Sequence, residues 1–174
     1  MRSPAYMAVL LLLSLAPAGL AQSQRDPFSP LSFLLGTWDA KTVNNPAVNA
    51  IGNYTFRTEL NGHILARHTI ADPSKCKGPA DFNCEHGDLL YIYSELPGQV
   101  LRAIYFDNEG HVIHYTVTTP TATSAEFLSD AASPGPQFRL FYELRSGAMN
   151  GKFQIRMPGQ QEWKSYLEWT GSRK

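Results

Sequence analysis

The sequence predicts an all-β protein: a single closed antiparallel up-and-down barrel of about ten strands with a short N-terminal helical plug. After position 36 the chain consists of short alternating, β-branched and aromatic runs without a further helical period. Turn residues separate these runs and leave no room for a crossover helix. A meander of ten strands removes its unpaired edges by closing into a barrel. A short apolar segment before the first strand suits one closed end.

That apolar segment is PLSFLLGTW, residues 30–38. Its leucines and phenylalanine fit one short turn of helix, of α or 3₁₀ type. Gly36 ends this turn because glycine adopts positive φ at no steric cost. Trp38 follows at the head of the first strand. We therefore expect the helical turn to plug the floor of the barrel.

Ten strands are expected in sequence, most of them ending at a recognisable turn. Asn61-Gly62 is a type I′ hairpin signal and Pro97-Gly98 marks another turn. The predicted strands cover residues 37–43, 52–60, 63–71, 88–95, 100–106, 111–118, 124–129, 138–144, 152–157 and 163–170. Loops after odd-numbered strands are mostly long and those after even-numbered strands mainly tight. This predicts an open mouth, a closed floor, and Arg173 near Trp38.

The N-terminal segment is expected to lie outside the barrel domain. Residues 1–21 have a positive start at Arg2, a short apolar run and small residues before Ala21, which predicts a signal peptide. The apolar run is too short for a membrane anchor. Residues 22–29 are a polar leader segment with Pro27, and residues 30–174 form the lipocalin-like domain. We expect an exported bacterial protein, periplasmic or secreted.

Charge and cysteine content narrow the classes of partner. The chain has 15 Lys+Arg and 15 Asp+Glu, and this balance argues against bulk electrostatic binding to nucleic acid or anionic membranes. Cys76 and Cys84 are the two cysteines, and in an oxidising compartment they predict one disulfide. Two cysteines at this spacing give half a zinc site at best, so no metal site is predicted, and His86, two residues beyond Cys84, keeps zinc binding as the minority alternative. We expect a monomer or weak dimer.

The candidate ligand-binding residues are aromatic, histidine and arginine side chains within the strands. They are Tyr54, Phe56, His68, Tyr91, Tyr93, Arg102, His114, Phe141, Arg156 and Tyr166. The rings either line a cavity or fill an ordinary core, and apolar residues on both faces of several strands leave the inner face undecided.

Four arginines, at positions 67, 102, 139 and 156, lie within strands. An arginine that faces inward must be paired or await an anionic ligand, because an unpaired buried charge is costly. Arg102 and Arg156 are the preferred inward candidates.

The GTW motif at residues 36–38, the ten strands and the late Arg173 resemble the calycin superfamily of lipocalin-like barrels. The resemblance implies that Trp38 packs under Arg173 in a cation–π contact and that Gly36 is structural. The segment YTFRTELNGHILARHTI is similar to the second hairpin of bacterial exported DUF1579-type barrels. The heme-binding nitrobindins share LLGTW but are more distant: DAKTVNNPAV replaces their glycine-spaced run, and no histidine follows His114.

The functional expectation is an exported barrel that holds an apolar or weakly acidic small molecule, with no required cofactor. Relatives that bind fatty acids use inward Arg and Tyr, which is what the resemblance implies here. One alternative is a heme-binding barrel with His68 or His114 as axial ligand. Another is a small lipocalin-like enzyme of decarboxylase or isomerase type. No nucleophile motif is present, and Glu59, Glu126, Glu143 and Glu168 alternate like outward residues, so no catalytic residue is assigned.

Overall fold

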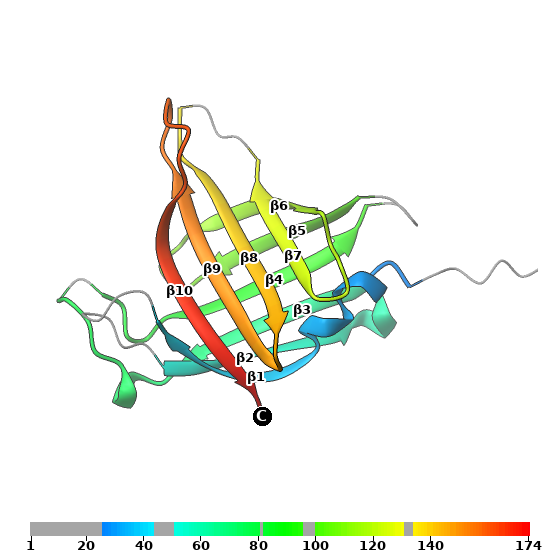
Figure 1. Ribbon diagram of the computed structural model, residues 1–174, viewed down its shortest axis with the longest axis horizontal. Helices are drawn as coiled ribbons and strands as arrows, with labels where there is room; N and C mark the ends of the chain where they lie inside the picture. Colours follow the sequence, from blue (N-terminus) through cyan, green and yellow to red (C-terminus); the bar gives the residue numbers. More distant parts are fainter. Residues whose placement is uncertain (1–25, 44–50, 81, 96–99, 131–133) are drawn as a thin grey trace, which may run out of the picture.

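A computed structural model describes residues 26–43, 51–80, 82–95, 100–130 and 134–174 (Figure 1). Ten antiparallel strands pair in sequence order and close through β1 and β10, which confirms the predicted fold class. The elements are η1 (Ser29–Leu34), β1 (Gly36–Thr42), β2 (Ile51–Glu59), η2 (Leu60–Gly62), β3 (Ile64–Ala71), η3 (Pro73–Lys75), β4 (Gly87–Ser94), β5 (Leu101–Asp107), β6 (Val112–Thr118), β7 (Ser124–Ser129), β8 (Gln137–Arg145), β9 (Ala148–Arg156) and β10 (Lys164–Arg173). The predicted signal peptide lies outside the described residues.

The largest difference from the predicted strands is at the start of β9, which begins four residues earlier than expected. Ser146 and Gly147 both have positive φ and form a two-residue turn between β8 and β9. Because this turn is so short, both flanking strands extend to it. β10 likewise continues to Arg173, since its last residues pair with β1 to close the barrel.

The plug is confirmed as the 3₁₀ helix η1 at the start of β1. Leu31 and Leu34 are fully buried in the core cluster, and Phe28, from the segment expected as a polar leader, packs there as well. The indole Nε1 of Trp38 donates a hydrogen bond of 2.8 Å to the carbonyl oxygen of Leu34. This bond ties the plug to the first strand.

Trp38 and Arg173 meet where β1 and β10 close the barrel. The two residues are directly paired across the strands, and the Arg173 guanidinium carbon lies 4.7 Å from the centroid of the indole ring. Gly36 has φ +112°, and a Cβ there would lie 3.1 Å from Arg173 Nη1. The predicted Gly–Trp–Arg arrangement is therefore present.

The register determines which side chains point inward. Cross-strand partners share a face, and the row Phe56, Arg67, Leu90, Tyr105 crosses four neighbouring strands. Phe56, Arg67 and Leu90 in this row are buried, which identifies the inner face. Every residue two positions from a member of this row along its strand faces inward too.

The barrel interior is tightly covered near the plug and less covered at the opposite end, which we call the open end. In Figure 1 η1 lies at the right of the barrel and η3 with the β3–β4 connection at the left. Inward residues toward the open end are only partly buried. They include Ala40, Tyr105, Ile113, Phe138, Phe153, Leu167 and Trp169. Solvent therefore reaches the part of the barrel interior that lies nearest the open end.

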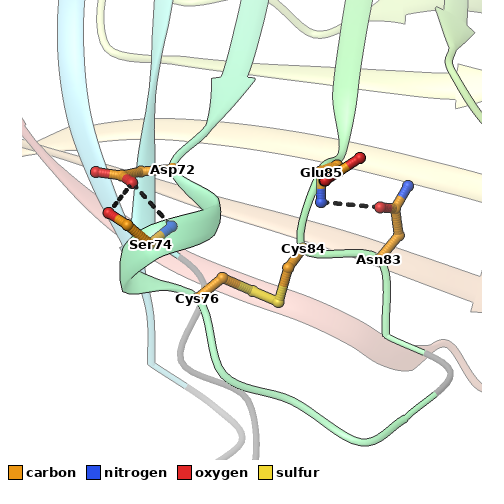
Figure 2. The surroundings of a disulfide bond; sticks show 6 residues. All are labelled: Asp72, Ser74, Cys76, Asn83, Cys84 and Glu85. Atoms are coloured by element: carbon orange, nitrogen blue, oxygen red, sulfur yellow. Dashed lines mark hydrogen bonds between the residues drawn. A yellow bond between two sulfur atoms is a disulfide. The ribbon is translucent and has the colours of Figure 1, made fainter.

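The β3–β4 connection is shaped by the predicted disulfide between Cys76 and Cys84, whose Cα atoms are 5.5 Å apart (Figure 2). The Asp72 side chain caps η3 by accepting from the backbone N–H of Ser74 at 3.1 Å. A disulfide indicates an oxidising compartment. No helix in the described part of the chain has the length and apolar character needed to cross a membrane.

Candidate ligand-binding site in the barrel interior

Two of the ten candidate ligand-binding residues face into the barrel. Tyr54 and Phe56 lie on β2, both buried, and their rings meet edge to face at 6.0 Å. The aromatic residues on the outer face are Tyr91, Tyr93 and Phe141, each flanked along its strand by buried inward residues. Tyr166 is 63% exposed beside the irregularity in β10 between Ser165 and Leu167. Tyr91, Tyr93 and Phe141 therefore do not line the interior, whereas the exposed Tyr166 meets the inward ring of Phe153 edge to face at 6.1 Å.

The expectation that Arg102 and Arg156 face inward is wrong. Arg102 pairs with Asp130 at 2.8 Å and donates to Thr116 on the outer face of β5 and β6. Arg156 donates to Gln137 and lies over the ring of Trp163. Both are placed outward by strand alternation, because their neighbours along the strand belong to the inner face.

The two histidines considered as heme ligands also lie on the outer face. His68 Nε2 is 3.1 Å from Glu59 Oε1, and its ring meets the edge of Tyr91. His114 is exposed and pairs across the sheet with Ile104, an outward residue. A ligand inside the barrel is out of reach of both, so the heme alternative loses its proposed axial residues.

The inward arginine is Arg67, in the middle of β3. It is 4% exposed, and its Nη2 lies 2.5 Å from Asp88 Oδ1, while its Nη1 donates to the Tyr142 hydroxyl. Asp88 is at the start of β4, two residues before Leu90, and so faces the same interior. A buried guanidinium requires such a partner, because an isolated charge there would be strongly unfavourable.

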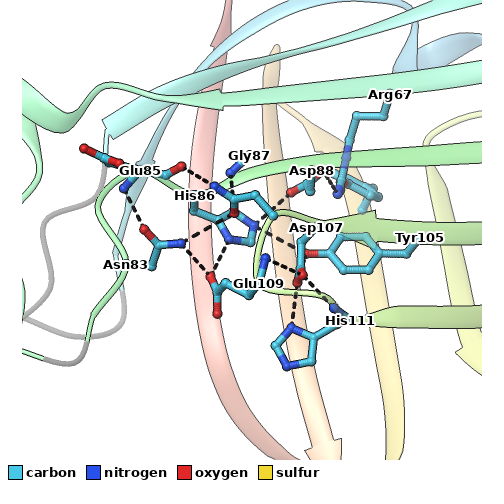
Figure 3. A network of polar contacts seen from close by, with 12 residues as sticks. Arg67, Asn83, Glu85, His86, Gly87, Asp88, Tyr105, Asp107, Glu109 and His111 are labelled. Atoms are coloured by element: carbon cyan, nitrogen blue, oxygen red, sulfur yellow. Dashed lines mark hydrogen bonds and ion pairs between the residues drawn. The ribbon is translucent and has the colours of Figure 1, made fainter.

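A chain of polar contacts connects this buried ion pair to the rim of the open end (Figure 3). His86 Nε2 lies 3.2 Å from Asp88 Oδ2, and His86 Nδ1 lies 2.9 Å from Glu109 Oε1 in the β5–β6 turn. Asn83, from the disulfide loop, donates to the same Glu109 oxygen at 3.0 Å. His86 thus joins the β3–β4 connection to the β5–β6 turn.

A second branch of the rim network centres on Asp107, at the end of β5. The Tyr105 hydroxyl donates to Asp107 Oδ2 at 3.1 Å, and His111 Nδ1 lies 2.8 Å from the same oxygen. Backbone N–H groups of Glu109 and His111 also donate to the carboxylate. Asp107 therefore fixes the turn that leads into β6.

The pKa shifts show which of these groups stay charged. Burial alone would raise the pKa of Asp88, but the charge of Arg67 and the hydrogen bond from His86 lower it overall. The hydrogen bond to Asp88 raises the pKa of His86, with a further contribution from Glu109. Burial raises the pKa of Tyr142 to about 12, so its hydroxyl is neutral. Asp88 is thus an ionised partner of Arg67 and a poor proton donor.

Three buried polar atoms have no hydrogen-bond partner of ordinary geometry among the described residues: Tyr54 Oη, Arg67 Nε and Trp169 Nε1. Two of them are neighbours, because the Trp169 side chain lies near enough to the Tyr54 hydroxyl to act on its pKa as a weak donor. All three side chains surround the ring of Tyr142. The Tyr54 and Trp169 rings lie 6.1 and 5.7 Å from it, and the Arg67 guanidinium carbon lies 6.0 Å from its centroid. Leaving such a group unsatisfied costs roughly 1–3 kcal/mol. An acceptor brought by a ligand or by water would satisfy them.

Sequence reasoning missed Asp88 and Asp107 because both stand at strand ends, where alternation is hard to follow. Their position could have been found by counting in twos from the strand centres: Asp88 precedes Leu90 and Asp107 follows Tyr105. Among the described residues no group of three or more His, Cys, Asp or Glu side chains is arranged to hold a metal ion.

Comparison of the chain with protein-family models and with curated proteins gives no match. The closed ten-strand antiparallel barrel is consistent with a calycin-like fold. The interior geometry therefore carries the functional argument.

Proposed function

We propose that this protein is an exported small-molecule-binding barrel that holds an apolar or weakly acidic ligand in its interior. The ligand enters at the open end, in a protein that is periplasmic or secreted by a bacterium. The resemblance to DUF1579-type exported barrels supports this compartment, and so does the Cys76–Cys84 disulfide. The hypothesis of a nitrobindin-like, heme-binding barrel has less support because the side chains of His68 and His114 point outward.

The observation that carries the proposal is the set of three buried donors without acceptors around Tyr142. A folded interior rarely leaves several polar groups unsatisfied, and such groups are typical of sites that a ligand completes. Between these atoms and the open end, the inner-face residues are mostly apolar and partly exposed. Among them, the rings of Phe138 and Phe153 are stacked with centroids 5.7 Å apart and planes at 12°. A small molecule with an apolar body and one polar end fits this division.

A second candidate is the small acid–base enzyme, which is favoured by Asp88 lying beside Arg67 and Tyr142 in the interior. An enzyme of this kind needs a group that exchanges a proton near working pH. Asp88 is paired with Arg67 and its pKa is lowered, whereas the pKa of Tyr142 is raised. Both shifts move the pKa away from neutral pH, so they favour a binding protein over an acid–base enzyme. Incubating a bound ligand with the protein and following its mass separates the two candidates.

The test is a thermal-unfolding screen of the purified protein against fatty acids, phenolic acids, hemin and neutral aromatic compounds. A ligand at 100 times its Kd stabilises the fold by about 2.7 kcal/mol, which raises Tm measurably. We expect apolar compounds with one oxygen-bearing end to give the largest shifts. If none of these compounds raises Tm, the proposed function is wrong.

Replacement of Tyr54 by Phe links the screen to the interior site. We expect Tyr54→Phe to weaken ligand binding about tenfold, the value of one hydrogen bond. It should leave the stability of the free protein unchanged or slightly higher, because the lost hydroxyl is buried and makes no hydrogen bond of ordinary geometry. Tyr93→Phe, on the outer face of β4, is the control and should change neither quantity. Equal binding by the two variants would contradict the assignment.

A further inference from the structure

The interior carries no uncompensated positive charge, although it contains a buried arginine. Arg67 is neutralised by Asp88 at 2.5 Å, and the second oxygen of Asp88 faces His86 at 3.2 Å. His86 is itself paired with Glu109 at 2.9 Å. With His86 protonated, these two cations and two carboxylates sum to zero.

Two further charged groups lie on the inner face at this end: Lys164, which pairs with Ile155 and is exposed at the first residue of β10, and a buried carboxylate, Asp107. The Asp107 carboxylate is almost fully buried, and its hydrogen-bond donors are the neutral Tyr105 hydroxyl, His111 and two backbone N–H groups. The buried part of the interior is therefore neutral or negative overall. A carboxylate that entered it would be a buried charge without a counter-ion, which is strongly unfavourable.

The three unpartnered atoms offer donors suited to an uncharged oxygen. Trp169 Nε1 can only donate, Tyr54 has a neutral hydroxyl, and Arg67 offers its Nε–H while its charge is already paired. We propose that the barrel binds its ligand in uncharged form, through an amide, ester or protonated carboxylic acid oxygen that accepts from these groups. This inference rests on the proposed function and specifies the chemical class of its ligand.

Among the three donors, Trp169 is the one whose placement depends on a neighbouring glycine. Its ring lies across Gly151 on the neighbouring strand, where a Cβ would be 2.1 Å from the indole Cε2. Only a glycine at position 151 leaves room for this placement. Trp169 is partly exposed, whereas Tyr54 and Arg67 are buried. Because the indole Nε1 is one of the three donors, ligand binding should change the fluorescence of Trp169.

The test compares 4-phenylbutyric acid with its amide and its methyl ester, which share one apolar body. Binding is measured by calorimetry and Trp fluorescence at pH 5.5 and 7.5. We expect the amide and ester to bind with a Kd that hardly changes with pH. The Kd of the acid should rise about tenfold per pH unit, because only its shrinking protonated fraction binds. The fluorescence change should disappear in Trp169→Phe.

Acid binding that is as tight as amide binding and independent of pH would overturn the inference and leave the proposed function standing. Failure of all three compounds, while other members of the screen bind, would also overturn the inference alone. If nothing in the screen binds, both proposals fail. The amide reports any effect of pH on the protein itself, including titration of His86.

Asp88→Asn provides an independent check because it removes the counter-ion of Arg67 with little change in shape. We expect it to shift the ratio of acid to amide affinity at least tenfold toward the acid at pH 7.5. An unchanged ratio in folded Asp88→Asn would contradict the proposal. If this variant does not fold, the pH titration of the unmodified protein decides.

Discussion

At the scale of single residues, the decisive feature is a buried charge and the partner that permits it. Arg67 sits in the middle of a strand among aromatic rings, with its guanidinium carbon 5.9 Å from the Tyr105 centroid. Its burial is tolerated because Asp88 neutralises it and Tyr142 accepts a hydrogen bond. The same pairing removes the need for an anionic ligand. One residue pair thus determines both the stability and the selectivity expected of the interior.

Breaking this pair should destabilise the protein strongly. Asp88→Ala leaves the Arg67 charge buried without a partner, and we expect the free energy of unfolding to fall by about 3–5 kcal/mol. The double variant Arg67→Met/Asp88→Leu removes both charges and should lose clearly less than the single variant. Urea unfolding of the single and double variants measures the difference. A double variant no more stable than Asp88→Ala would show that packing, and not the unpaired charge, causes the loss.

At the scale of elements, two connections at the open end are held to the barrel by the rim network. The disulfide closes the loop between β3 and β4, and His86 joins the end of this loop to Glu109 in the β5–β6 turn. The His86 side chain is about one-third exposed, so the imidazole can exchange protons directly with solvent. The groups that face it are Asp88, Glu109 and the Tyr105 hydroxyl.

Stability should pass through a maximum at mildly acidic pH. The raised pKa of His86 means that its contribution is complete below about pH 6.5 and is lost as pH rises through its folded-state value. The lowered pKa values of Asp88, Asp107 and Glu109 mean that their contributions are complete above about pH 4 and are lost in more acidic solution. Chemical unfolding across pH 3–9 measures this profile.

His86→Gln should remove the decline on the alkaline side while retaining the decline in acid. His63→Gln is the matched control, because His63 is exposed beside η2 at the plug end, away from this network. A decline above pH 6.5 that persists unchanged in His86→Gln would assign it to another group.

The disulfide should contribute modestly to global stability. Cys76 and Cys84 enclose a short loop, and the chain-entropy model gives on the order of 2–3 kcal/mol for such a loop. We expect the Cys76→Ser/Cys84→Ser variant to fold, with a reduced free energy of unfolding. Thiol titration of the unfolded, unreduced protein should find no reactive thiols; two thiols would refute the bridge.

At the scale of the whole molecule, closure of the barrel brings the two ends of the domain together. β1 and β10 pair directly over five residue pairs, and this seam joins parts of the chain more than one hundred residues apart. Trp38 lies at the plug end of this seam, fully buried, and contacts the plug on one side and the Arg173 guanidinium on the other. Closure therefore depends on one large side chain that contacts both ends.

Trp38→Ala should cost about 3–5 kcal/mol, because it empties a large volume at the seam. Arg173→Ala should cost much less, about 1 kcal/mol, since the cation–π contact is made by an exposed guanidinium. Denaturant unfolding of both variants tests this ranking. Similar losses for the two variants would indicate that Arg173 holds the seam by more than its contact with the ring.

The resemblance to calycin barrels implied the Gly36–Trp38–Arg173 contact. The sequence by itself determined the strands, their antiparallel order, the plug and the disulfide. Each of these follows from local pattern: alternation defines a strand, Asn61-Gly62 a turn, and two cysteines in an exported chain a bridge. Closure follows in turn from ten strands without a crossover connection. Local signals were therefore sufficient for the architecture.

Only the tertiary structure decided which face of each strand is inside. Several strands have apolar groups on both faces, as Phe141 and Tyr142 do on β8, so composition could not separate them. The cross-strand register fixed the inner face and placed Arg67, rather than Arg102 or Arg156, within it. Its pairing with Asp88 spans 21 residues of sequence. Such a pairing depends on the alignment of two strands in space, which no local pattern encodes.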